Sequence, residues 1–493
     1  MAYALLFTFY GCGHTSDNTD GWGVGDIASR IPVSIYFPGS PGKDMDRVLE
    51  EIEKESAPLL NIELKFNWIE ASEYEGAIAS KLASAQNFDA FYYSEVYDLG
   101  ESGSALTLPE LVNNNLVYNI NGLFQQYAPG IYGSLSEEEM KAITFDNKIV
   151  AIPWRFPVSS RKSAAVRDDL NALYIEGGVA DFEDLEVFAD KITGSKINIV
   201  PIGLFTGTLE LFAPHMGFTV FDERLGLVYR ENDPGMQLML WEETPEYRDV
   251  LLRLLSWYKK GYIPSEFENK DEAGFFYGKY ACFIDEIYQA LFMNTRIKAG
   301  IDTEFKYKIY SLYPEYKMPK KSLLENAILI NKNSSKPESV LMFLEWVHSS
   351  QKNHDLLMYG IEGEHYTIYG EQYVLPPQVN IENHPYMGWG GSEAFLNINF
   401  IRTSVYNDPF SKQLLTDETR SEYAPHHGIH PVLRDFEAIK RRTDNFQKLN
   451  KPSLSMLDNP DNIERFIAEN SDYSFHKTVE ELQRQLNEWF IRK

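Results

Sequence analysis

The first part of the chain alternates short apolar runs with amphipathic segments. Runs at 33–37, 62–68 and 89–93 have the length of strands and are rich in aromatic or β-branched residues. Helical spacing follows the first run, with four apolar residues on one face: Met45, Val48, Leu49 and Ile52. A second helical segment separates the next two runs. This order of strands and helices predicts an α/β fold with a parallel sheet and helices on its faces.

Aromatic and acidic side chains stand where these strands end. Tyr36 and Trp68 lie at the ends of the first two runs, and Tyr93 and Glu95 lie at the end of the third. In parallel sheets, ligands bind beyond the carboxyl ends of the strands. Aromatic faces suit the C–H faces of sugar rings, and carboxylates accept hydrogen bonds from hydroxyls. We therefore place these four residues in a candidate binding site, although Trp68 could equally belong to the core.

A second set of elements follows residue 150. The predicted helices and strands are 182–192, 245–260, 279–284, 306–313, 337–349 and 479–491. Asp285 and Glu286 follow the strand at 279–284, so we expect them in a loop. There they could bind ligand hydroxyls, form a solvated turn or cap a helix.

Composition and charge exclude several classes of protein. The 493 residues include 46 Lys and Arg against 72 Asp and Glu, a formal net charge of −26. Such a surface repels phosphate backbones and anionic lipid, which argues against nucleic-acid binding. Hydrophobic residues make up 44% and charged residues 24%, which is ordinary for a globular protein. Aromatic residues reach 14%. This content suits a surface that handles sugars or peptides, although most of the rings must be core.

Cysteines and histidines offer little metal chemistry. Cys12 and Cys282 are the two cysteines of the sequence, which excludes a disulfide framework and a multi-cysteine zinc site. His426, His427 and His430 form the one histidine cluster, and neighbouring prolines favour a surface loop. We expect no metal site and no cofactor.

The N-terminal residues resemble a bacterial lipoprotein signal. Residues 1–11 are apolar or small and too few to span a bilayer, and Cys12 follows Gly11 directly. Cleavage there would leave Cys12 as a lipidated N-terminus, and the polar, Gly-rich residues 12–30 would form a flexible tether. Phe9, Tyr10 and the absence of preceding Lys or Arg depart from the usual pattern. The alternative is a buried or ragged N-terminus with an accidental cysteine.

Four stretches in order carry a resemblance to a known family. They are Tyr36 to Asp46, Asn147 to Pro153, Tyr359 to Tyr366 with its Tyr-Gly-Ile-Glu-Gly start, and Leu482 to Trp489. Together they resemble the extracellular solute-binding proteins of bacterial ABC importers, family 1. Within that family they are most similar to the LipO-like subgroup, which has a C-terminal domain of unknown function.

The resemblance implies a two-lobed periplasmic-binding-protein-like fold of type 2, with a ligand cleft between the lobes. It implies discontinuous lobes, 31–150 plus 304–352 and 151–303 plus 353–493. It also implies a monomer that closes on its solute by a hinge motion and delivers it to the transmembrane subunits of an ABC permease. The protein would be lipid-anchored on the extracellular face of the cell membrane.

The crossing between lobes adds further candidate ligand contacts. Trp154 and Arg155 follow the crossing segment, and Trp389 lies in a Gly-flanked loop. Stacking on the two tryptophans would supply affinity, and Glu95, Asp285 and Arg155 would orient the ligand. For Trp154 the alternative is an aromatic that packs the hinge, and for Arg155 it is an ion pair between lobes.

We therefore expect a receptor for a small solute and no covalent chemistry, and the aromatic candidates favour an oligosaccharide as that solute. A receptor of the same fold for a peptide or another non-sugar solute is one alternative, which charged rather than aromatic cleft walls would indicate. A glycan-degrading enzyme is a less favoured alternative. Glycoside hydrolysis needs two carboxylates held ~5–9.5 Å apart, and sequence pairs such as Asp285 and Glu286 arise by chance among 72 acidic residues. The sequence has neither a Gly-x-Ser-x-Gly elbow nor a Walker phosphate loop.

Overall fold

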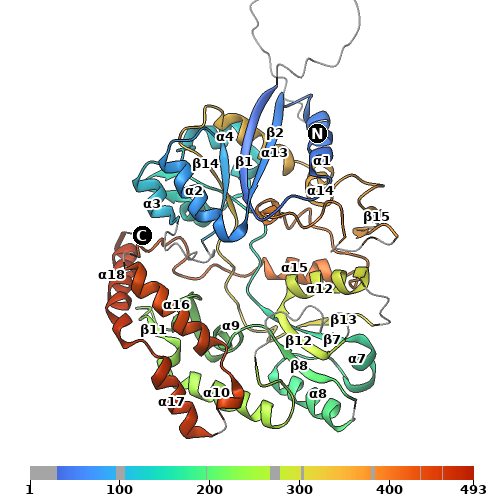
Figure 1. The fold of residues 1–493 in the computed structure, drawn as a ribbon, viewed down its shortest axis with the longest axis vertical. Helices are drawn as coiled ribbons and strands as arrows, with labels where there is room; N and C mark the ends of the chain where they lie inside the picture. Colours follow the sequence, from blue (N-terminus) through green and yellow to red (C-terminus); the bar gives the residue numbers. More distant parts are fainter. Residues whose placement is uncertain are drawn as a thin grey trace, which may run out of the picture.

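Two bodies, each built on its own sheet, make up the protein (Figure 1). The computed structural model describes residues 30–95, 106–195, 197–266, 278–300, 305–377, 379, 383–433, 435–457 and 459–492. We call the body that contains the N-terminal strands the first lobe and the other body the second lobe. The predicted two-lobed α/β fold is thereby confirmed.

The first lobe is built on a five-stranded sheet. Its order is β2 (Ile62–Ile69), β1 (Ile31–Pro38), β3 (Ala90–Tyr93), β14 (Ala327–Ile330) and β6 (Ile152–Pro153). The predicted strands β1, β2 and β3 pair in parallel, whereas β14 runs antiparallel to β3 and β6. The carboxyl ends of the three parallel strands therefore lie at one edge of this sheet.

Helices cover this sheet as the apolar spacing predicts. In α1 (Met45–Ser56), the four apolar residues expected on one face are all buried. The other helices of this part of the chain are α2 (Tyr74–Ala83), α3 (Leu108–Asn113), α4 (Asn121–Tyr127), α5 (Pro129–Ser134), α6 (Glu137–Ala142) and α13 (Pro337–Val347). A two-stranded ribbon, β4 (Thr144–Phe145) with β5 (Lys148–Ile149), precedes β6.

The second lobe has a four-stranded sheet of order β13 (Tyr307–Ser311), β7 (Lys162–Arg167), β12 (Tyr280–Glu286) and β8 (Val200–Leu204). Strands β8 and β12 are parallel, and β7 is antiparallel to both β12 and β13. The helices around it are α7 (Asp168–Tyr174), α8 (Phe182–Gly194), α9 (Thr208–Phe212), α10 (Pro245–Lys259), α12 (Ile287–Gly300) and α15 (Ser411–Glu418). Helix α10 begins where expected, because the Thr244 hydroxyl accepts the N–H of Tyr247 and Pro245 occupies the first turn.

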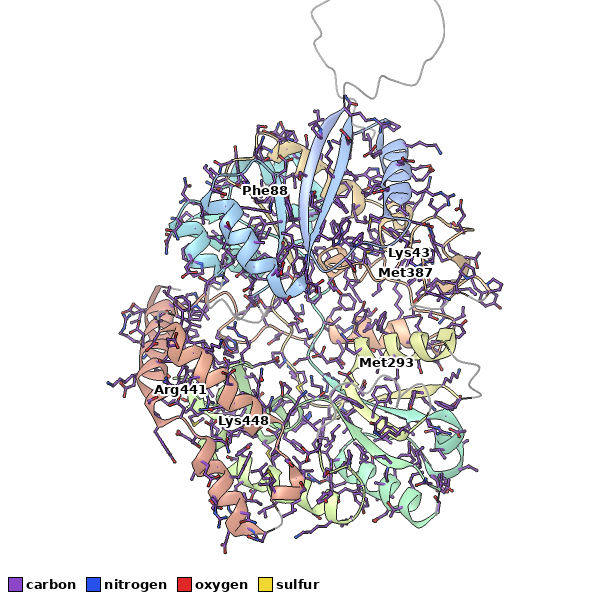
Figure 2. All side chains as sticks on the ribbon, viewed as in Figure 1. Lys43, Phe88, Met293, Met387, Arg441 and Lys448 are labelled. Carbon is purple, nitrogen blue, oxygen red and sulfur yellow. The ribbon has the colours of Figure 1, made fainter. Side chains whose placement is uncertain are left out.

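The chain crosses between the lobes later than the predicted boundaries at 303/304 and 352/353. Strand β13 was assigned to the first lobe with 304–352, but it pairs with β7 in the second. Conversely, α14 (Gln351–Tyr359) and the loop through Phe395 pack into the core of the first lobe. Figure 2 shows Lys43 and Met387 side by side there, and the N–H of Asp44 donates to Pro385 O at 2.9 Å. Core packing, which the sequence spacing does not reveal, decides these boundaries.

The C-terminal helices lie along one side of the second lobe (Figure 1). They are α16 (Phe436–Asn450), α17 (Pro460–Asn470) and α18 (His476–Arg492), so the predicted helix at 479–491 is confirmed. They pack near a small sheet of β11 (Met239–Leu240), β10 (Leu227–Arg230) and β9 (Phe218–Asp222). The hairpin of β15 (Thr367–Tyr369) and β16 (Gln372–Val374) completes the elements. None of the helices in the described ranges is both long and apolar enough to cross a bilayer.

Candidate functional site

Charged side chains from both lobes and from the segments that cross between them form one cluster. Lys162 begins β7 and Glu286 ends β12, and their side chains pair at 3.1 Å. Lys321 comes from the crossing segment between β13 and β14, and its ammonium lies 2.7 Å from Glu286 and 3.0 Å from Glu325. We call Lys162, Glu286, Lys321 and Glu325 the interlobe cluster.

Each cation of the interlobe cluster stabilises Glu286. Burial alone would raise the pKa of this carboxyl, but Lys162 and Lys321 outweigh burial and lower its pKa to about 2. Glu286 in turn raises the pKa of Lys162 and Lys321, although burial opposes the change. Glu286, Lys162 and Lys321 are therefore charged at neutral pH, whereas burial raises the pKa of Glu325.

Glu223, in the turn between β9 and β10, is an exposed carboxylate beside this cluster. Its side chain makes no hydrogen bond or ion pair with any of the residues that the structure describes. Even so, desolvation by the surrounding protein raises its pKa to about 7, and the carboxylates of Glu210 and Glu286 add to the rise. Lys162 and Lys321 only partly oppose these effects.

The next residue of this turn, Arg224, links the second lobe to the first electrostatically. Its guanidinium is 3.0 Å from Asp222, whose charge raises the pKa of Arg224, and the charge of Glu95 at the end of β3 raises it further. Glu95 is tied to the crossing segment, because its N–H donates to Leu324 O at 3.0 Å. Desolvation and the charge of Glu95 also raise the pKa of Tyr93. The predicted pair Tyr93 and Glu95 thus borders the charged residues of the second lobe.

Trp154 and Arg155 tie the crossing segments together rather than lining a recess. Only 4% of Trp154 is exposed, and its Nε1 donates to Ser322 O at 3.2 Å. The ring packs in an apolar cluster with Phe156 and Leu396, which matches the hinge-packing alternative. The Arg155 guanidinium donates to Ser134 O at 2.9 Å, and desolvation lowers its pKa.

Trp389, a predicted ligand contact, is buried rather than open to a ligand. Only 2% of this residue is exposed, and its ring lies 5.4 Å from Phe37 and 6.1 Å from Trp68, measured between ring centroids. The physical reason is Gly390, at which a Cβ would overlap the carbonyl of Pro38. Without that atom the loop lies directly on the end of β1, and Trp389 enters the core.

The remaining candidates at the strand ends differ in their surroundings. Trp68 is half-buried and donates its Nε1 to Gly390 O at 3.0 Å. The Tyr36 ring packs edge-on against Phe88 at 5.2 Å, with the ammonium of Lys81 4.7 Å from its centroid. It therefore contacts its own lobe.

Asp285 lies within β12 opposite Ser163, not in the expected loop, because the strand continues through Glu286. Its Oδ1 accepts the N–H of Glu286 at 2.8 Å.

Sequence reasoning missed Lys162, Glu210, Glu223, Arg224 and Lys321. No local pattern marks them, since they come from segments far apart in the chain, and their common position appears only in the fold.

The histidine cluster is dispersed. His426 contacts the Tyr229 hydroxyl at 2.9 Å, His427 stacks on Tyr423, and His430 contacts Ala142 O at 3.0 Å. Within the described ranges no three His, Cys, Asp or Glu side chains are grouped to hold a metal ion. Cys282 is a buried free thiol, and Cys12 with the rest of the predicted signal and most of the tether lies outside the described residues.

Two sheets joined by crossing segments, with charged groups where the lobes meet, define a two-lobed solute-binding-protein fold. No family model matches the chain. Over 99% of its length the chain is 20% identical to a carbohydrate ABC transporter substrate-binding protein of Streptococcus pneumoniae serotype 4, and the match covers 97% of that relative. The predicted resemblance to the solute-binding proteins of ABC importers is thereby confirmed. The narrower likeness to the LipO-like subgroup stays a prediction.

Solved structures share the fold. The chain is similar to the N-glycan transport solute binding protein NgtS of S. pneumoniae, with a TM-score of 0.69 at 17% identity over 93% of this chain and 99% of that one. A complex of NgtS with Man5GlcNAc gives 0.63 at 17% identity over 94% and 99%. A Listeria monocytogenes substrate-binding protein, Lmo0181 with cycloalternan, gives 0.53 at 15% identity over 90% and 98%.

Proposed function

We propose that this protein is the solute-binding receptor of an ABC importer and captures an oligosaccharide between its two lobes. The observation that carries the proposal is the polar site where the lobes meet, in a chain similar throughout to a carbohydrate ABC transporter substrate-binding protein. Carboxylates and ammonium groups can exchange hydrogen bonds with sugar hydroxyls. Binding is reversible and leaves the solute chemically unchanged.

Glu95, Glu223 and Glu286 are the ligand contacts that we favour, with Trp68 as a partly exposed ring. Glu95 and Glu223 come from different lobes, so a ligand that bonds both would favour the closed arrangement. Trp154 and Trp389 act on affinity only through packing, because their rings are buried.

The receptor works at the outer face of the cell membrane, as a monomer that delivers its solute to the transmembrane subunits of a permease. Lipidation of Cys12 would hold it there. In its native host, Cys12→Ala should move the protein from the membrane fraction to the medium. A variant that stays in the membrane fraction would refute the anchor and leave the receptor proposal intact.

The experiment that tests the proposal is thermal unfolding of residues 30–493 with neutral tetra- to hexasaccharides of the malto, cello, manno, xylo and chito series. Short peptides serve as the comparison panel. A ligand at ~100 times its Kd stabilises the folded state by ~2.7 kcal/mol, which raises the unfolding midpoint measurably. A rise with a saccharide and none with peptides supports the proposal, whereas a rise with peptides alone contradicts it.

A peptide or another charged solute is the second candidate. The specific observation in its favour is that charged groups, rather than the predicted tryptophans, occupy the place where the lobes meet.

A further inference from the structure

Helix α16 contacts two segments, 207–210 and 222–226. They carry Glu210 and Glu223, two carboxylates next to the interlobe cluster. Near the middle of the helix, the fully buried Arg442 donates its Nε–H to Leu225 O at 2.8 Å and forms an ion pair with Glu242, which is equally buried. At its end, the Asn450 Oδ1 accepts the N–H of Leu209 at 2.8 Å. The Asn450 Nδ2 donates to the two carboxylate oxygens of Glu210 at 3.2 and 3.0 Å.

Two glycines let these segments approach the helix closely. A Cβ at Gly207 would overlap the Asn450 amide, and a Cβ at Gly226 would overlap the Phe446 ring. Gly226 also has φ +60°, a conformation that glycine adopts without strain. Segments 207–210 and 222–226 therefore lie directly against one face of α16, and the helix fixes the distance between them.

This arrangement holds two carboxylates together that would otherwise separate. Glu210 and Glu223 repel each other, and their repulsion contributes to the raised pKa of Glu223. Around them, Lys162 and Lys321 are already paired with Glu286, and Arg224 is paired with Asp222. His215 is close to Lys162, but desolvation lowers its pKa to about 4, so it adds no positive charge at pH 7.

We propose that α16 is a positioning element of the binding site, which holds Glu210 and Glu223 as hydrogen-bond acceptors for an uncharged or amino-bearing saccharide. The inference rests on the proposed function, because it assigns a ligand class to that site. Arg442, Phe446 and Asn450 are positioning residues, which act through the two carboxylates without contacting the ligand. A uronate, a sialylated glycan or a sugar phosphate would bring a further negative charge next to Glu210 and Glu223, where Lys162, Lys321 and Arg224 are already paired with carboxylates.

A measurement without ligand tests the positioning role. In Asn450→Asp, Oδ1 still accepts the Leu209 N–H, but a carboxylate oxygen replaces the Nδ2 that donates to Glu210. The new negative charge lies next to Glu210 and should raise the pKa of Glu223 further, despite Lys162 and Lys321. The unfolding midpoint of the variant should then fall more steeply than that of the wild type between about pH 4.5 and 8.

Two variants complete this measurement. Lys448→Ala, on the exposed side of the same helix (Figure 2), should follow the wild-type pH profile. Asn450→Ala removes the hydrogen bonds without adding charge, so it should lower the midpoint without making its pH dependence steeper. If the pH profile of Asn450→Asp is parallel to that of Asn450→Ala, the positioning role is wrong.

Ligand binding tests the assigned class. The probes are the neutral saccharide panel described above, with oligogalacturonides and sialyllactose as anionic saccharides. We expect the wild type to bind at least one neutral saccharide and no anionic one, and Asn450→Asp to bind the neutral one roughly tenfold or more weakly. Lys448→Ala should stay within about twofold of the wild type. Equal binding of anionic saccharides, or unchanged affinity of Asn450→Asp, overturns the inference.

Failure of the proposed function gives a different experimental result from failure of the positioning role. If no saccharide of either panel binds the wild type, the oligosaccharide receptor is refuted and the ligand class with it. The pH profile of Asn450→Asp would still decide whether α16 positions the carboxylate pair.

Discussion

Glu286 illustrates how a single residue can stabilise the place where two lobes meet. Its carboxylate is shared by Lys162 and Lys321, one from a strand of the second lobe and one from a crossing segment. A buried charge that loses its partner keeps the cost of desolvation without the compensating attraction. Glu286 therefore matters for the stability of the folded protein.

Glu286→Gln should lower the free energy of unfolding by about 3 to 5 kcal/mol, because two largely buried ammonium groups lose their shared partner. Urea unfolding at pH 7 measures this loss. Glu481→Gln, which breaks an exposed pair with Arg484, is the matched control and should cost about 0.5 kcal/mol or less. A loss below about 1 kcal/mol for Glu286→Gln would contradict the structural role assigned to the cluster.

Glu223 has the opposite effect on stability. Its pKa is raised from the usual 4.5 to about 7, so the folded protein retains a proton that the unfolded chain releases over that range. The residue therefore destabilises the folded state increasingly as the pH rises from 4.5 to about 7, and by a constant amount above. Glu223→Gln should raise the unfolding midpoint above pH 7 and leave it almost unchanged at about pH 4. An equal shift at both pH values would refute the raised pKa.

At the scale of elements, the spacing of apolar and capping residues along the chain correctly predicted the features that depend on residues close together in sequence. The buried face of α1 and the start of α10 follow from residues close together in sequence. The place of Trp389 does not, because it depends on contact between Gly390 and Pro38, far apart in the chain. The same holds for Glu223 and Lys162, which no short motif could connect. Of the predicted site residues, Trp154 and Trp389 are buried. Arg155 and Tyr36 are half-buried and contact neighbouring groups of the protein.

The contact between the Trp389 loop and β1 gives a test with an internal control. In Gly390→Ala the new methyl group overlaps the Pro38 carbonyl, so we expect a loss of about 1 to 3 kcal/mol in the free energy of unfolding. Gly122→Ala, in helix α4 with no atom near the new Cβ, should instead add about 0.5 to 1 kcal/mol. Equal effects in urea unfolding would mean that the loop does not lie against β1 as described.

At the scale of the whole molecule, the chain passes from the first lobe to the second, back, and again to the second. The sequence predicted this interleaving only through the family resemblance, and two of its boundaries were misplaced. Strand β13 joins the second sheet through pairing with β7, and α14 joins the first core through apolar contacts. The lobe to which β13 and α14 each belong depends on packing between residues far apart in the chain. The spacing of apolar residues along the sequence does not show such packing.

Capture between two lobes predicts a change of shape on binding. The most direct test is small-angle X-ray scattering of residues 30–493, alone and with the saccharide that gives the largest rise in the thermal panel. The account predicts a smaller radius of gyration at saturating ligand, because a bound ligand favours the closed arrangement of a two-lobed protein. An unchanged scattering curve under conditions where the same sample binds the saccharide would contradict capture between the lobes.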